Sequence, residues 1–222
     1  MRKAALLAVG LALLVTGCGG KEASKSATDV ETQAGGRNVP AGFTIRLVRS
    51  AGFSIALPKA WQSLDAQEAL KSESMQRFRK INPELEPSIQ ALVQPNSPIK
   101  LLAVGPGHDR GFVTNLNVLV SRIPAGVTYE QWSSAEIAEL KKVPTIEGLT
   151  QEETALAPGR ALHATYRTSV NRQGGRFTAH IDQYLVKKGP SLYVVTFTTT
   201  PRLLAKFEPT FSKSVRTFRL TD

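Results

Sequence analysis

The sequence predicts an α+β fold, an α/β/α sandwich in which an antiparallel β-sheet is covered by helices on both faces. Four consecutive segments are typical of strands joined by tight turns, so they must pair antiparallel. They are residues 149–156, 160–170, 177–187 and 191–200. Helical patterns stand before, within and after the strands, and can therefore reach both faces of the sheet. In the last strand, Leu192 and Val194 alternate with Tyr193 and Val195, which indicates burial on both sides.

The first residues have the features of a bacterial lipoprotein signal. Arg2 and Lys3 precede an apolar run over residues 4–15 that is too short to span a bilayer. Thr16-Gly17 then stands directly before Cys18, which matches a lipobox. We expect residues 1–17 to be a signal peptide, with an ordinary signal and an incidental cysteine as the alternative. Lipidation of Cys18, for example with palmitate, would anchor the protein on the extracytoplasmic face of the cell membrane.

Cys18 is the one cysteine of the chain, so its lipidation would leave no thiol for a disulfide, a nucleophile or a metal ligand. Residues 18–41 are small and polar, which predicts a flexible tether, and residues 42–222 are long enough for one domain. The net charge of +10 falls to +8 without Arg2 and Lys3. The cations are scattered, which argues against nucleic acid as a partner and leaves both plain solubility and an anionic surface open.

The first half of the domain predicts two strands and then helices. Alternation over residues 43–49 and 53–57 predicts strands, and Trp61 is expected to pack after Pro58. Asp65 with Glu68 predicts a helix start, and the helical pattern runs to about residue 81. Asn82-Pro83 predicts a second helix start, whose inner face ends near Val93.

The second half alternates strands, helices and turns. Residues 99–104 and 112–123 read as strands, with a loop over residues 105–111 between them. His108-Asp109 in this loop is either a solvated turn or a pair for metal or acid–base chemistry. Thr128 with Gln131 predicts a capping box for the next helix. A closing helix follows Thr200-Pro201, and Pro209 is expected to kink or split it.

This order of elements resembles the PsbP-like family, and within it the actinobacterial lipoproteins of the LpqN type. The features that match lie across residues 43–220. They are Phe53–Pro58 leading to Trp61, the Thr114–Val118 strand, the helix with Trp132 before Leu140, the hairpins, and the closing segment Phe211–Phe218. The resemblance implies an α/β/α sandwich and non-enzymatic roles, in partner binding, assembly of envelope or photosynthetic complexes, or lipid handling. It supplies no catalytic residue, cofactor or metal.

Five polar residues on neighbouring strands are the candidate ligand-binding residues. If the turn at residues 171–175 centres near Gln173, opposing residues have numbers that sum to about 347. One face of the hairpin then carries Arg167 opposite His180, Thr165 opposite Asp182, and His163 opposite Tyr184. Such a row is either a ligand pocket under a helix, with Arg167 binding an anion, or a structural hydrogen-bond row or partly exposed face.

The sequence therefore predicts a membrane-anchored, non-enzymatic module that binds an envelope partner protein. The alternative is a carrier of a lipid or another apolar ligand, because several aromatic residues are either core or the lining of an acyl groove. These are Phe112, Tyr129, Trp132, Phe197, Phe207 and Phe211. A hydrolase is third, since the sequence contains no G-x-S-x-G or HExxH motif.

Overall fold

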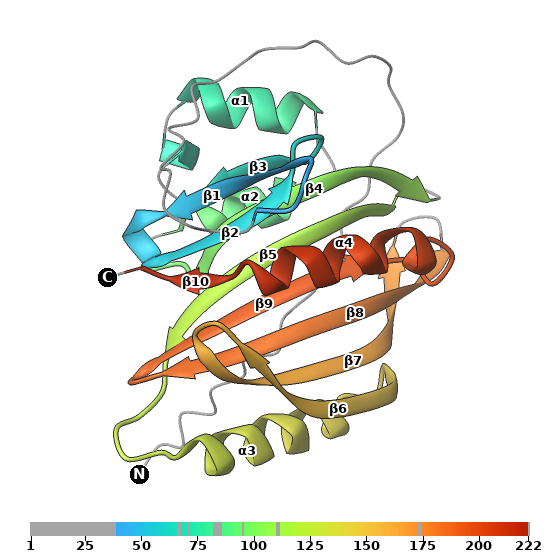
Figure 1. The fold of residues 1–222 in the computed structure, drawn as a ribbon. Coiled ribbons are helices and arrows are strands. Elements are labelled where there is room, and N and C mark those ends of the chain that lie inside the picture. The colour runs from blue at the N-terminus through green and yellow to red at the C-terminus, as the bar shows by residue number, and fades with distance from the viewer. Residues whose placement is uncertain are drawn as a thin grey trace.

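The computed structural model describes residues 39–65, 68–70, 72–81, 86–94, 96–109, 112–172 and 175–221. Residues 1–38 lie outside this part, so the signal peptide, Cys18 and most of the tether remain predictions. In the described part, a seven-stranded antiparallel sheet has the order β3-β4-β5-β9-β8-β7-β6 (Figure 1). Its strands are β3 (Gln62–Asp65), β4 (Ile99–Asp109), β5 (Phe112–Arg122), β6 (Ile146–Leu156), β7 (Gly159–Arg172), β8 (Gly175–Lys188) and β9 (Ser191–Thr199). The four predicted consecutive strands are β6 to β9, and they are confirmed.

A second, three-stranded sheet in the order β1-β2-β10 was not predicted. It consists of β1 (Phe43–Val48), β2 (Phe53–Pro58) and β10 (Arg219–Leu220). A 3-10 turn at Arg49–Ala51 joins the first two strands. Only two residues of β10 pair with β2, at Ser54 and Phe53, so local sequence carries almost no signal for this strand.

One face of the large sheet, here the α4 face, is covered by the small sheet and by helix α4 (Leu204–Arg216). Phe207, Phe211 and Val215 of α4 are buried against Val195 and Phe197 of β9. The Phe197 and Phe211 rings stack with centroids 4.7 Å apart. The helix therefore rests on the apolar residues that have odd numbers in β9.

The opposite face, here the α3 face, has two separate helical covers. Helix α3 (Tyr129–Lys142) packs Trp132, Ile137 and Leu140 onto apolar residues of β7, β8 and β9. Helices α1 (Ser72–Ile81) and α2 (Glu86–Leu92) cover β3, β4 and β5 instead. Helices thus lie on both faces of the antiparallel sheet, as predicted.

Two helix starts have the predicted capping boxes. The side chain of Asp65 accepts a hydrogen bond from the Glu68 amide at 2.7 Å, and Glu68 accepts one from the Asp65 amide at 3.1 Å. This start opens a 3-10 turn, Glu68–Leu70, before α1. Thr128 and Gln131 form the same reciprocal pair at the start of α3. The Asn82-Pro83 start lies outside the described residues.

Two local predictions are wrong. The loop expected over residues 105–111 is strand as far as Asp109, because β5 continues to pair up to the Asp109–Phe112 pair, with a register shift after Val104. The last helix continues through Pro209, so the expected split does not occur, and the expected kink stays a prediction. Pro209 and Ala205, whose carbonyl loses its intrahelical donor, are both exposed residues. Among the described helices, none has the length and apolar character that a membrane span needs.

Candidate functional site: a histidine between two carboxylates

The β7–β8 hairpin has the predicted register. Arg167 pairs with His180, Thr165 with Asp182, and His163 with Tyr184, all at a residue-number sum of 347. Since side chains alternate along a strand, these residues share one face, and the core contacts of Tyr184 identify it as the α4 face. That they bind a ligand stays a prediction.

His163 is held by a carboxylate at each ring nitrogen. Its Nε2 lies 2.6 Å from Asp182 Oδ1, and its Nδ1 lies 2.9 Å from Glu152 Oε1. The side chains of His163 and Asp182 are 17% and 10% exposed, whereas that of Glu152 is 69% exposed. A neutral imidazole has one N–H donor, so both hydrogen bonds form together only when the ring is protonated. We call His163, Asp182 and Glu152 the histidine bridge.

The ring of Tyr184 fixes the plane of the imidazole. The two rings stack with centroids 4.1 Å apart and an interplanar angle of 5°. Tyr184 is itself buried and contacts Phe197 edge to face at 6.5 Å. The bridge therefore borders the apolar core under α4 on one side and water at Glu152 on the other.

The surroundings shift the pKa values of the two histidines in opposite directions. Burial disfavours the His163 imidazolium, but the hydrogen bonds and negative charges of Asp182 and Glu152 outweigh burial and raise the pKa of His163. Burial lowers the pKa of His180, assisted by the charge of Arg167, against the opposing charges of Asp182 and Glu208. Burial, followed by the charges of Asp182 and Glu152, raises the pKa of the Tyr184 hydroxyl.

Arg167 and His180 stand apart from the histidine bridge. Arg167 is exposed, and its guanidinium lies beside Gly148, where an added Cβ would be 3.8 Å from its Nη2. His180 is half-buried near Glu208 of α4, whose charge acts on its pKa. The structure thus brings three of the five predicted residues into direct contact and leaves these two as neighbours.

Glu152 was missing from the predicted set. Its own strand β6 pairs with β7 across the turn after Leu156, and this register places Glu152 opposite His163. The turn residues of this hairpin are Ala157 and Pro158, so opposing residue numbers sum to 315. A turn centred on Pro158-Gly159 would instead place Thr154 opposite His163, so the Pro-Gly signal alone misses Glu152.

The histidine bridge has the geometry of a charged cross-strand tie. Its carboxylates approach opposite edges of the ring, so they do not converge on one point, and no group of three metal-ligating side chains occurs in the described part of the chain. The nearby Thr165 hydroxyl of β7 lies 2.6 Å from the Thr150 hydroxyl of β6, so these two side chains form a further hydrogen bond between β6 and β7. The arrangement ties edge strand β6 to β7 and β8 through a protonatable ring.

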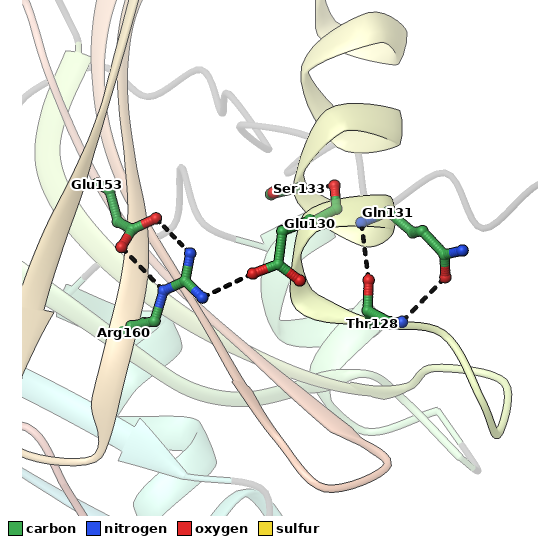
Figure 2. Close-up of polar contacts among 6 residues, drawn as sticks. All are labelled: Thr128, Glu130, Gln131, Ser133, Glu153 and Arg160. Atoms are coloured by element: carbon green, nitrogen blue, oxygen red, sulfur yellow. Dashed lines mark hydrogen bonds and ion pairs between the residues drawn. The ribbon is translucent and has the colours of Figure 1, made fainter.

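A second polar cluster fixes α3 on the opposite face (Figure 2). Arg160 of β7 holds Glu153 of β6 with two hydrogen bonds, at 2.8 and 2.7 Å, and Glu130 of α3 with one at 2.7 Å. Its guanidinium carbon lies 4.3 Å from the centre of the Tyr129 ring. This cluster was not predicted, because it depends on how α3 docks on the β6–β7 hairpin.

The aromatic residues do not line one acyl groove. Phe197, Phe207 and Phe211 are buried in the core of the α4 face. Trp132 and Tyr129 belong to the cluster under α3 on the opposite face. These five residues lie on opposite faces of the sheet and therefore do not line one common groove, and Phe112 is also buried.

Comparison with solved structures shows a PsbP-like fold. The chain is similar to cyanobacterial PsbP (CyanoP) from Synechocystis, with 14% identity, a TM-score of 0.54, and coverage of 86% of this chain and 98% of that one. It also matches LpqN of Mycobacterium tuberculosis, described as involved in cell envelope biogenesis, at 10% identity, a TM-score of 0.49, and coverage of 77% and 83%. No family model and no curated sequence matches the chain.

Proposed function

We propose that this protein is a lipoprotein held on the extracytoplasmic face of the cell membrane by lipid on Cys18. The observation that carries the proposal is the order of residues 1–18, in which a basic start and a short apolar run end on Thr16-Gly17-Cys18. Two or more acyl chains on one residue hold a protein firmly at a membrane without a spanning helix.

We further propose that the domain is a non-enzymatic module that binds an envelope partner protein. Its PsbP-like fold supports this, because the sequence resemblance to that family implies binding and assembly roles. The histidine bridge supports it too: both ring nitrogens of His163 are engaged by carboxylates, which leaves the ring no free position from which to activate a nucleophile.

Metabolic labelling with an alkyne fatty acid, followed by mass spectrometry of the membrane fraction, tests the anchor. The expected result is a diacylglyceryl-modified N-terminal peptide that begins at Cys18, and its absence from a Cys18→Ala variant. Unmodified Cys18 in the wild-type membrane fraction would contradict the proposal.

Crosslinking in the native membrane followed by affinity capture tests the partner. The matched control is residues 1–41 fused to an unrelated domain, because this chain keeps the anchor and tether and lacks the PsbP-like domain. One protein enriched over this control is expected. Enrichment of nothing above it would count against partner binding.

The alternative function is a carrier of a lipid or another apolar ligand, which is motivated by the expected membrane location and by the aromatic residues. Native mass spectrometry of the mature chain with Cys18→Ser, which carries no covalent lipid, distinguishes the two functions. A retained lipid-sized mass would favour the carrier, and an empty chain would favour the binding module.

A further inference from the structure

Helix α4 carries a row of exposed cations on the side away from the core. We call it the cationic stripe: Arg202, Lys206, Lys213 and Arg216. At 100° per residue, Lys206, Lys213 and Arg216 fall within about 80° of the helix circumference, and Arg202 stands just before the first turn. The buried residues Phe207, Phe211 and Val215 occupy the opposite side.

Few acidic residues of the described part of the chain lie close enough to neutralise the charge of the cationic stripe. Lys206, Lys213 and Arg216 form no ion pair with any described residue. Arg202 has a long contact with Asp109 at 3.5 Å, and its side chain is 75% exposed. The single acidic residue of α4, Glu208, lies on the flank, where its charge acts on His180.

The chain enters the domain in the same layer as the stripe. The first described residues lead from Pro40 into β1, and β1 pairs with β2, against which α4 packs (Figure 1). At this entry, the Lys59 amide donates a hydrogen bond to the Gly42 carbonyl at 2.9 Å, and the Lys59 side chain is exposed. The predicted tether therefore joins the domain on the layer that presents the stripe.

From this placement we propose that the outer side of α4 docks on the anionic phospholipid surface of the membrane to which the protein is anchored. This inference rests on the proposed lipid anchor. If residues 18–41 form the flexible tether that their composition predicts, its root-mean-square length would be about 25–30 Å, which would keep the domain close to the headgroups. Each Lys or Arg near an anionic leaflet strengthens partitioning roughly fivefold, and salt screens the effect.

Docking through α4 would orient the molecule. The α3 face is the side of the large sheet opposite α4, and strand β6 is at the edge of that sheet. Both would therefore point away from the membrane, toward the rest of the envelope. A partner protein could then reach them without competing with the membrane.

Vesicle co-sedimentation of the mature chain with Cys18→Ser tests the inference, because binding through lipid on the protein is then absent. The probe is a phosphatidylcholine vesicle with about one third phosphatidylglycerol, compared with phosphatidylcholine alone, at about 0.15 M salt. The test variant is Lys206→Gln with Lys213→Gln. The matched control is Lys141→Gln with Lys142→Gln on α3, two exposed lysines with the same change in net charge. Circular dichroism verifies that both variants fold.

The expected result is that the α4 variant binds roughly 25-fold more weakly, while the α3 variant binds like the wild type. Equal loss in both variants would overturn the inference, since net charge alone would then explain binding. Equal binding of the wild type to vesicles with and without phosphatidylglycerol would also overturn the inference. So would a result in which Lys206 and Lys213 are needed to capture an acidic protein while the chain does not bind vesicles. The labelling of Cys18 is a separate measurement, so failure of the anchor and failure of the docking surface are distinguishable.

Discussion

The indole ring of Trp61 lies directly against the backbone of Gly105. A Cβ on residue 105 would be 2.9 Å from Cε2 and 3.0 Å from Cζ2 of the indole, closer than side chains pack. The same ring contacts Phe207 of α4 edge to face at 6.3 Å. Trp61 therefore joins the segment after β2, strand β4 and helix α4, and the absence of a side chain at Gly105 makes this possible.

Gly105→Ala is expected to lower the free energy of unfolding by about 1–3 kcal/mol, because the rigid indole has to move within a packed core. Urea unfolding followed by tryptophan fluorescence measures the change. Gly126→Ala tests a different cause, since Gly126 has open space around it and only its positive φ of 84° opposes a side chain. A smaller loss at Gly105 than at Gly126 would contradict the packing argument.

His163→Gln is expected to destabilise the protein by about 1–3 kcal/mol at acidic pH, because Asp182 loses its charged partner near the core. The pKa of His163 is raised in the folded protein, so its stabilisation is complete below the unfolded value of about 6.5. The stabilisation is lost as the pH rises through the higher folded value. Unfolding free energies across this range test the sign, and a difference that is constant with pH would contradict it.

His180→Gln is the matched comparison, because the contribution of His180 to the free energy of unfolding is expected to change with pH in the opposite direction. Because the pKa of His180 is lowered, the unfolded chain binds the proton more tightly, and wild-type stability falls as the pH drops through about 6.5. The variant is expected to lose this part of the pH dependence. Proton NMR of the two imidazoles gives both pKa values directly.

Glu136→Gln is expected to stabilise the protein above neutral pH. Glu136 is a buried side chain of α3, and burial, together with the charge of Glu139, raises its pKa to about 7. Stability contributed by the protonated carboxyl declines as the pH rises from about 4.5 to 7. At pH values above both pKa values, Gln should recover roughly 1–3 kcal/mol. An equal gain at about pH 4 would show that packing, not ionisation, is the cause.

Arg160→Lys is expected to loosen the start of α3, because an ammonium group cannot replace the forked pair with Glu153 and the bond to Glu130 at once. Hydrogen exchange is expected to accelerate for amides in the first turns of α3. Arg122→Lys, at an exposed end of β5, serves as the control. Unchanged exchange in α3 would show that its capping box and Trp132 are sufficient to hold the helix.

The sequence contained most of the local structure. Thr128 and Gln131 predict the start of α3 because capping is an interaction between residues three apart. The hairpin register that places His163 opposite Tyr184 follows from the turn near Gln173 because each tight turn sets the pairing of its own two strands. Applied to the Pro158-Gly159 signal, the same argument places Thr154 opposite His163, because the turn in the structure lies one residue earlier, at Ala157-Pro158.

Relations between distant segments were decided by the tertiary structure. Strand β10 pairs with β2 and places Leu220 opposite Phe53. A strand of two residues is too short for a local sequence pattern to predict it. Strand β4 extends through His108 because β5 supplies its partners, which overrides the loop preference of its glycines. Turns, helix caps and the alternation of apolar residues determine local structure. The β10–β2 and β4–β5 pairings depend instead on which surfaces meet once the core has formed. Local sequence pattern likewise marks Cys18 and the helical spacing of the α4 cations, whereas the tertiary structure decides that the opposite side of α4 is buried and the side with the cations is exposed.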